Sequence, residues 1–200
     1  MKEPFAKFVE SKLGADTLLI TCGLPGTWKT ETSEEISRIK GYPILRSDLI
    51  RLDVLKGENT FDEKVASDMS KRTMVYDETF RQADEALEKS DSVILDATFV
   101  TQSLRRQAAA IAAKHNKTLV ILQTHCPQEV AIARILRRTQ ENYESNALTE
   151  QAYLNNKKKF EEVDLDDLKR WYPNLDIMHV TVDTQYDPPE DWYIIGMEKR

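Results

Sequence analysis

The chain has 200 residues and a formal net charge of −6, with 40% hydrophobic and 31% charged residues. These values predict one globular domain, spanning residues 1–200, with a sizeable core. They argue against a membrane or secreted protein, because no apolar run approaches the length of a membrane span and the N-terminus lacks the apolar core of a signal peptide. We therefore expect a cytoplasmic protein without a membrane partner. The negative charge also disfavours non-specific nucleic-acid binding, which depends on neutralising phosphates.

The few cysteines and histidines suggest neither a disulfide framework nor a zinc site. Cys22 and Cys126 lie at the ends of two apolar runs, where free cysteine usually serves as a small buried side chain. His115, His125 and His179 show no metal-ligand spacing, which favours structural or surface roles.

Short β-rich runs alternate with longer helical patterns, which is typical of a parallel sheet covered by helices. In chain order, the predicted strands span residues 18–21, 43–46, 92–95, 119–124 and 177–182. The predicted helices span residues 30–40, 48–55, 62–89, 102–116, 128–139 and 149–160. We therefore expect a three-layer α/β domain with a five-stranded, mostly parallel sheet.

The first strand runs into a glycine-rich turn that fits seven of the eight positions of the pattern G-x-x-x-x-G-K-[ST]. Gly23 holds the first position and Lys29-Thr30 the last two, while Trp28 stands where the second glycine belongs. Such a loop turns its backbone N–H groups around a phosphate at the start of a helix. The residues expected to hold the nucleotide phosphates are Gly23, Leu24, Pro25, Gly26, Thr27, Trp28, Lys29 and Thr30.

In this interpretation Lys29 bridges the β- and γ-phosphates of ATP, and the Thr30 hydroxyl is a ligand of Mg²⁺. Pro25 and Gly26 are also common turn formers, so a simple tight turn is the alternative. A turn alone does not require the apolar strand before it or the Lys-Thr pair after it. Trp28 leaves two outcomes open: its indole packs away from the phosphates, or ATP binds poorly.

The second strand is followed by Arg46-Ser-Asp-Leu-Ile-Arg51 at a strand-to-helix junction. In a doubly wound sheet the carboxyl ends of the strands form the ligand crevice, so this junction is expected beside the phosphate loop. Ser47 or Asp48 fits a helix cap equally well on this segment alone. Together with a phosphate loop, Asp48 is favoured as the carboxylate that orients an acceptor hydroxyl and takes its proton, with Arg51 binding the acceptor.

The third strand ends at Asp96, just past a buried apolar run. A carboxylate there is suited to hold a Mg²⁺-bound water, or to position an arginine or the acceptor hydroxyl. A simple turn residue is the alternative.

Three arginines, Arg134, Arg137 and Arg138, share one broad face of the helix predicted at residues 128–139. A solvated basic face is one explanation. The other is a lid over residues 134–150, whose guanidinium groups stabilise the charge of the transferring phosphoryl group while the lid excludes water.

The C-terminal segment from residue 188 to 192 has early prolines and acids, which suggests a helix start or a frayed tail. We expect the adenine pocket near the turn after the last predicted strand, around Asp183 and Thr184.

Taken together and in this order, the motifs resemble those of the zeta-toxin-like and polynucleotide-kinase-like P-loop kinases, over residues 17–183. The matching segments are residues 23–30, Ser47-Asp48 with Arg51, Asp96-Ala-Thr98, and Arg134 with Arg138. The resemblance implies a P-loop NTPase kinase fold with a helical lid. It also implies that Asp48 is the general base, that Arg51 contacts the acceptor, and that a lid arginine assists transfer.

We therefore predict an ATP- and Mg²⁺-dependent kinase whose acceptor is a hydroxyl of a small or medium-sized molecule. A polynucleotide 5′-hydroxyl is the second candidate, disfavoured by the acidic net charge. Its phosphates would need basic contacts, for which the candidates are Arg46, Arg51, Arg105 and Arg106. A third candidate function is a nucleotide-binding regulatory module that lost efficient chemistry when Trp28 replaced glycine. The oligomeric state is left open.

Overall fold

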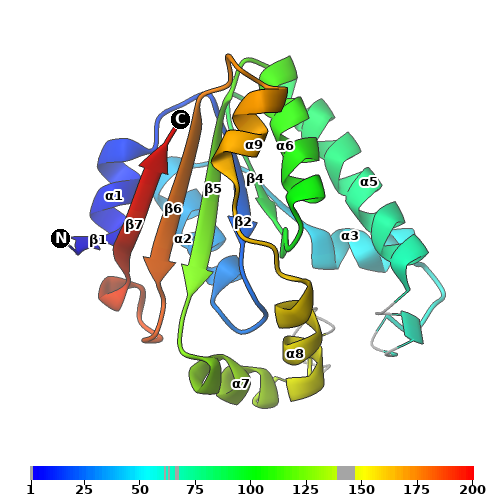
Figure 1. Cartoon of the computed structure of the whole chain (residues 1–200). Helices are drawn as coiled ribbons and strands as arrows, with labels where there is room; N and C mark the ends of the chain where they lie inside the picture. The colour runs from blue at the N-terminus through cyan, green and yellow to red at the C-terminus, as the bar shows by residue number, and fades with distance from the viewer. Residues whose placement is uncertain (1, 61, 63, 66–67, 139–146) are drawn as a thin grey trace.

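The computed structural model of the chain describes residues 2–60, 62, 64–65, 68–138 and 147–200. Within them, seven strands form one mixed sheet in the order β1-β7-β6-β5-β2-β4-β3 (Figure 1). The strands are β1 (Glu3–Pro4), β2 (Thr17–Cys22), β3 (Ile44–Arg46), β4 (Val93–Asp96), β5 (Thr118–His125), β6 (Ile177–Asp183) and β7 (Tyr193–Lys199). Strands β2 to β6 run parallel to one another, whereas β7 is antiparallel to both β6 and β1.

The predicted sheet of five strands was too small. Its five strands correspond to the parallel part, but β1 and β7 extend the sheet beyond β6. Prolines and acids near residue 190 suggested a helix start, and they form only the short 3₁₀ helix η1 (Pro189–Asp191). The apolar residues that follow continue as β7 because Ile194 faces the core, where it packs with Trp192. The two-residue β1 is too short to give a periodic signal.

The helices are α1 (Phe5–Lys12), α2 (Lys29–Lys40), α3 (Ser47–Val54), α5 (Met69–Leu87), α6 (Gln102–Lys114), α7 (Gln128–Leu136), α8 (Glu150–Lys159) and α9 (Leu165–Trp171). Six of them match the predicted helices in position, while α1 and α9 were not predicted. Helix α5 begins later than expected because Asp68 caps it, accepting a hydrogen bond from the Ser70 N–H at 2.9 Å.

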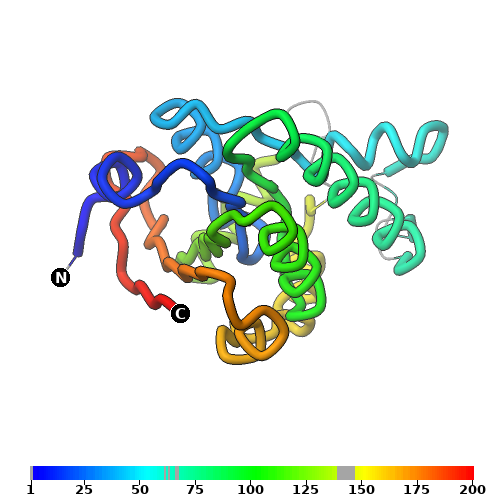
Figure 2. The backbone as a smooth tube through the Cα atoms, turned by 90° about the horizontal axis from the view of Figure 1, so that it is seen from above, coloured from blue at the N-terminus to red at the C-terminus, as the bar shows by residue number. Residues whose placement is uncertain are grey.

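Alternating strand residues divide the core into two layers, one on each face of the sheet. Leu18 and Ile20 of β2 pack with side chains of α5, α6 and α9, whereas Leu19 packs with α1 and α2. Viewed from above, the sheet lies between these two groups of helices (Figure 2). This confirms the expected three-layer α/β arrangement.

The carboxyl ends of β2, β4 and β5 meet at one end of the molecule, at the bottom of Figure 1, where α7 and α8 also lie. Ala131 and Ile135 of α7 pack against Tyr153 of α8 and against Leu24, which follows β2. The loop after β2 is thus enclosed by packed helices. The predicted lid continues through residues 139–146, which lie outside the described residues.

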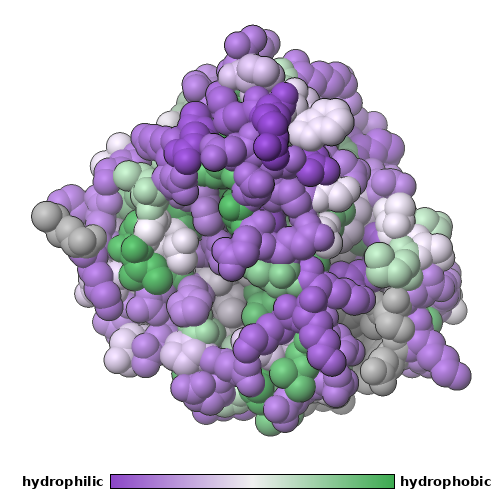
Figure 3. Space-filling view, in the orientation of Figure 1, coloured by the Kyte–Doolittle hydropathy of each residue, from purple (hydrophilic) through white to green (hydrophobic). Residues whose placement is uncertain are grey.

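In the orientation of Figure 1, most of the surface is hydrophilic and the hydrophobic areas are small and separate (Figure 3). Ile195 and Met197 on the outer side of β7 are among the exposed apolar side chains. No helix in the described part of the chain has the length and apolar character needed to cross a membrane.

Candidate active site

The loop from residue 23 to 28 joins β2 to α2 and depends on two glycines. Gly23 has φ = 145° and Gly26 has φ = 79°, and both lie against neighbouring elements. A Cβ atom on Gly26 would lie 2.4 Å from the carbonyl oxygen of Ala131 in α7. A Cβ atom on Gly23 would lie 2.8 Å from the Thr124 hydroxyl at the end of β5. Both positions therefore require glycine for close approach as well as for backbone conformation.

The carbonyl groups of this loop are held by donors around it. Leu24 O accepts from Lys29 Nζ at 2.7 Å, and Gly26 O accepts from Arg134 Nη1 at 3.3 Å. Thr27 O accepts from the Thr184 hydroxyl at 2.9 Å. Among the described residues, none accepts a hydrogen bond from the N–H groups of residues 26–30. The loop therefore offers a run of N–H donors at a helix N-terminus, which suits an anion such as phosphate.

Trp28 adopts the left-handed conformation, with φ = 59° and ψ = 38°, that a glycine would take without strain. Its ring centroid lies 4.5 Å from the Arg134 guanidinium carbon, and its Nε1 donates to Asp187 Oδ1 at 3.3 Å. The side chain therefore points to the outer side of the loop, away from the N–H groups. Of the two outcomes left open by the sequence, the outward-packed indole is the one observed.

Lys29, Thr30 and Asp96 come together where β2 and β4 lie side by side. The Thr30 hydroxyl donates to Asp96 Oδ2 at 2.6 Å. Burial raises the pKa of Asp96, an effect opposed by the Thr30 hydrogen bond and by the charge of Lys29. Burial likewise lowers the pKa of Lys29, while Asp96 acts in the opposite direction. A half-buried lysine and a buried carboxylate thus lie near each other beside the phosphate loop.

The Thr30 hydroxyl oxygen and the neighbouring Asp96 carboxylate oxygen are suitable ligands for a magnesium ion. Mg²⁺ prefers hard oxygen ligands and is usually held by one or two carboxylates together with substrate phosphates and waters. The Thr30 hydroxyl and the Asp96 carboxylate, 2.6 Å apart, supply such ligands next to the loop. In the described part of the chain, no group of three histidine, cysteine or acidic side chains is placed to bind a metal.

Asp48 lies in the first turn of α3 and bonds to Arg51 one turn later in the same helix. The N-cap residue of α3 is Arg46, whose side chain makes no capping hydrogen bond. Asp48 thus pairs with Arg51 rather than capping the helix. Strand β3 is paired with β4, and the Arg46 Nε lies 3.9 Å from Asp96 Oδ2. The charge of Asp48 also acts on the pKa of Lys29, so this carboxylate lies near the lysine of the phosphate loop.

The predicted lid arginines separate into different environments. Arg134 is 5% exposed and turned toward the outer side of the phosphate loop, and Arg137 is exposed to solvent. The charge of Arg138 lowers the pKa values of Lys29 and Glu31, so Arg138 lies near both of these residues. The predicted single basic face is therefore divided among three different environments.

Three polar residues beside the site were not identified from the sequence. Glu31, directly after Thr30, has a pKa raised by burial, and its position after the Lys-Thr pair was the available signal. Tyr76 of α5 reaches the loop after β4, where its hydroxyl lies 3.3 Å from the Thr98 hydroxyl. Asp187 follows β6, and no motif marked it. Thr184, expected near the adenine pocket, donates a hydrogen bond to Thr27 O of the phosphate loop.

Two of the four arginines considered as polynucleotide contacts are bonded to other groups of the protein. Arg105 is fully buried and donates to the backbone oxygens of Phe99, Glu161 and Glu162, at 3.0, 2.7 and 2.9 Å. Its predicted availability to substrate phosphates was wrong, because the connection before α9 covers it. Arg106 forms two hydrogen bonds to Asp167 of α9, at 2.7 and 2.8 Å.

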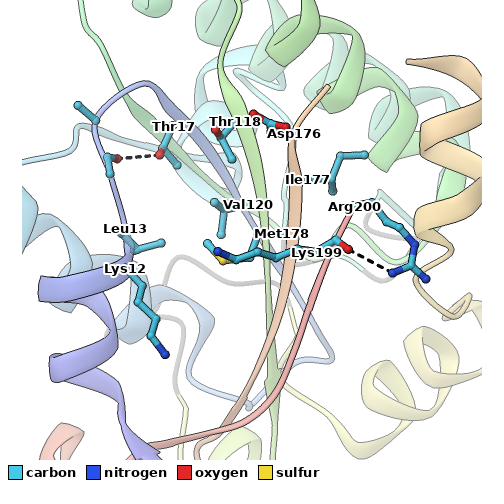
Figure 4. A pocket seen from close by; sticks show the side chains of 12 residues that line it. Lys12, Leu13, Thr17, Thr118, Val120, Asp176, Ile177, Met178, Lys199 and Arg200 are labelled. Atoms are coloured by element: carbon cyan, nitrogen blue, oxygen red, sulfur yellow. Dashed lines mark hydrogen bonds between the residues drawn. The ribbon is translucent and has the colours of Figure 1, made fainter. Parts of the chain in front are cut away.

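A second concavity lies at the opposite end of the sheet, where the parallel strands begin (Figure 4). Its volume is about 520 Å³, and its charged side chains include Lys12 and Arg200. Lys12 pairs with Glu3 at 2.7 Å, and Arg200 pairs with Asp166 at 2.8 Å. These charges are neutralised by neighbours and do not converge on a common point, in contrast to the charges beside the phosphate loop.

A family model described as an AAA domain matches residues 18–163, which include the phosphate loop, Asp48, Asp96 and the arginines of α7. The chain belongs to this AAA domain family. The match covers every element that forms the candidate site except the segment after β6.

Solved structures share the fold. A gluconokinase from Sinorhizobium meliloti 1021 is similar with a TM-score of 0.58 at 17% identity, over 88% of this chain and 87% of that one. Chaetomium thermophilum Kti12, in complex with ADP-AlF3, gives 0.56 at 21%, over 80% and 87%. A shikimate kinase from Acinetobacter baumannii gives 0.50 at 16%, over 93% and 91%. The chain therefore has an α/β P-loop kinase-like fold.

Proposed function

We propose that this protein is an ATP- and Mg²⁺-dependent kinase that transfers the γ-phosphoryl group to a hydroxyl of a small or medium-sized acceptor. The proposal rests on one observation, that two groups of polar residues lie at neighbouring strand ends. Lys29 and the Thr30–Asp96 pair lie at the phosphate loop, and the Asp48–Arg51 pair lies on the adjacent strand-to-helix junction. The sequence resemblance to zeta-toxin-like and polynucleotide-kinase-like enzymes supports the same division of roles.

In the proposed reaction, Asp48 takes the proton of the acceptor hydroxyl as its oxygen forms a bond to the γ-phosphorus. The bond between that phosphorus and the β–γ bridging oxygen breaks, and ADP leaves with the electron pair. Lys29 and Arg138 stabilise the charge on the transferring group. Bound Mg²⁺, held by Thr30 and Asp96, would neutralise phosphate charge. Arg134, predicted to share the catalytic role, faces the outer side of the loop, so the proposal relies on Arg138.

Isothermal titration calorimetry with ATP and Mg²⁺ tests the part of the proposal that concerns nucleotide binding. Lys29→Ala should weaken binding at least about tenfold, or about 1.4 kcal/mol, because a cation facing the phosphates is lost. The matched control is Lys40→Ala at the other end of α2, where the lysine bonds to Glu10 O on the surface. Absence of binding at millimolar ATP would exclude the kinase proposal.

A transfer screen with γ-labelled ATP tests the part of the proposal that concerns the phosphoryl acceptor. Sugars, nucleosides, 5′-hydroxyl oligonucleotides and cell metabolites should be offered, and Asp48→Asn should abolish the label transfer. A small-molecule acceptor is favoured because Arg105 and Arg106, two of the four candidate polynucleotide contacts, are held by other protein groups. Transfer to oligonucleotides that falls with salt and with Arg51→Ala would favour the polynucleotide alternative.

A nucleotide-binding regulatory module is the second candidate. It is favoured by Trp28 at a glycine position and by Glu31, a carboxylate close to Lys29 and Arg138. In such a module ATP binds, and Asp48→Asn leaves any hydrolysis unchanged. Trp28→Gly separates the two candidates: a gain of activity indicates a degenerate enzyme, whereas a loss indicates that the indole contributes to the working site.

A further inference from the structure

The outer side of the phosphate loop carries a cluster of three residues from distant segments, Trp28, Arg134 and Asp187, which we name the outer clamp. Trp28 comes from the loop itself, Arg134 from α7 and Asp187 from the segment after β6. The Arg134 guanidinium lies over the Trp28 ring at 4.5 Å, and Asp187 Oδ1 accepts from Trp28 Nε1 at 3.3 Å. The same carboxylate oxygen accepts from Arg134 Nη2 at 2.9 Å.

Arg134 is held on nearly every side. Its Nη2 also donates to Thr184 O at 2.8 Å and to Gln185 O at 2.9 Å. Its Nη1 donates to Gly26 O at 3.3 Å, and the residue is 5% exposed. A guanidinium group with this many acceptors would lose all of them if it moved across the loop to reach a phosphate. The geometry is that of a fixed support rather than of a moving arginine.

The backbone connects this support to Arg138. Arg134 O accepts from the N–H of Arg137 at 3.2 Å, and Ile135 O accepts from the N–H of Arg138 at 3.0 Å. The turn that ends α7 is thus anchored on the residue that the clamp holds. Arg138 lies close enough to Lys29 to influence it electrostatically. Fixing the Arg134 side chain therefore fixes the point from which Arg138 extends.

We infer that Trp28 and Arg134 are positioning residues, with the indole holding Arg134 against the outer side of the phosphate loop and thereby setting the position of Arg138. A side chain at a left-handed glycine position is unfavourable, and the cation–π contact with Arg134 and the hydrogen bond to Asp187 compensate for it. The inference rests on the proposed function, in which Arg138 stabilises the transferring group. It explains why this chain tolerates tryptophan where the pattern has glycine.

Hydrogen exchange in the absence of nucleotide tests the clamp independently of activity. Trp28→Gly should accelerate exchange about tenfold in residues 131–138 and 184–187, with β5 unchanged, because only local opening is affected. Trp28→Phe, which keeps a ring under Arg134, should restore most of the protection. Arg137→Ala, an exposed arginine on the same turn, is the control. Unchanged or slower exchange in Trp28→Gly would overturn the inference.

Single-turnover transfer with the acceptor found in the screen tests the link to Arg138. Trp28→Gly should lower the transfer rate about tenfold while the ATP dissociation constant changes less than about threefold. In a double-mutant cycle, Trp28→Gly should add almost nothing to Arg138→Ala, because both remove the same contribution. Additive effects, or a faster Trp28→Gly enzyme, would contradict the inference. If the parent protein transfers to no acceptor, the proposed function fails, and hydrogen exchange still decides whether the clamp exists.

Discussion

Two regions of the molecule each hold one aspartate with little exposure to solvent, and the pKa values of the two carboxyl groups are shifted in opposite directions. Asp96 at the phosphate loop and Asp167 in α9 are both 6% exposed. Burial raises the pKa of Asp96, whereas hydrogen bonds from Arg106 and Gln102 lower the pKa of Asp167 to about 2. Desolvation is the largest influence on the pKa of Asp96, whereas the hydrogen bonds from Arg106 are the largest influence on the pKa of Asp167.

Asp167 has a complete set of partners within the protein. Arg106 binds both of its oxygens, at 2.7 and 2.8 Å, and the Gln102 amide lies 3.1 Å from Oδ2. Asp96 accepts from the Thr30 hydroxyl at 2.6 Å and from the Thr21 hydroxyl at 3.4 Å, and the Arg46 Nε lies 3.9 Å from its Oδ2. Charged groups that are buried without full compensation are typical of ligand sites. The comparison therefore indicates a structural role for the α6–α9 contact and supports the proposed binding role of the end of β4.

Asp96→Asn should give the largest effect and should separate function from stability. Loss of the carboxylate should lower phosphoryl transfer by about 10² or more, because the charge beside Thr30 and Lys29 disappears. The free energy of unfolding in urea should change by less than about 1 kcal/mol, since a desolvated charge is removed as well. If Asp96→Asn lowered the free energy of unfolding as much as Asp167→Ala does, the two carboxylates would not differ in role.

Asp167→Ala should instead destabilise the protein by about 2 kcal/mol, the effect of losing hydrogen bonds to a charged group, and leave ATP binding unchanged. The reason is that Arg106 and Gln102 lose a buried partner that they share. Urea unfolding monitored by circular dichroism measures the change. Asp166→Ala is the matched control, because its side chain is 73% exposed and its ion pair with Arg200 lies on the surface. Equal losses for the two variants would contradict the assignment.

The phosphate loop should require glycine at position 26 for stability, because a neighbouring backbone leaves no room for a side chain there. Gly26→Ala should cost about 2–4 kcal/mol, because the added Cβ would lie 2.4 Å from Ala131 O and φ is 79°. Gly41→Ala has a similar φ of 72°, with nothing within 4 Å of the Cβ, and should cost about 1 kcal/mol. Chemical denaturation of both variants isolates the effect of the close contact. Similar costs would indicate that backbone strain alone matters.

The sequence predicted the parts of this molecule that local signals define. The loop at residues 23–30, the strand ends at Arg46 and Asp96, and the alternation of strands and helices each leave a continuous pattern in the chain. The structure also brings Thr30 next to Asp96, as expected from parallel strands that end at one edge. The predicted roles of these residues in catalysis stay predictions.

The remaining features depend on contacts between distant segments, which a single sequence does not reveal. Asp187 meets Trp28 across the loop, and Arg105 is enclosed by carbonyl groups of residues 161 and 162. The basic residues at positions 105 and 134 looked available for phosphate because the sequence shows charge but not burial. Strand β7 was missed because the prolines and acids that precede it, at residues 188–191, gave a stronger local signal than its own apolar residues.

The smallest expected effect is a pH dependence that follows from the same comparison. The pKa of Asp167 is about 2 in the folded protein and about 3.9 in an unfolded chain. The folded value is the lower one, so the stability from this carboxylate is present above about pH 4 and is lost as the pH falls toward 2. The stability difference between the parent and Asp167→Asn should therefore narrow between pH 5 and pH 3 in urea titrations. Asp166→Asn, at the neighbouring exposed position, is the control. A constant difference for Asp167→Asn over this range would show that the Arg106 pair does not favour the charged form, and the contrast with Asp96 would then rest on geometry alone.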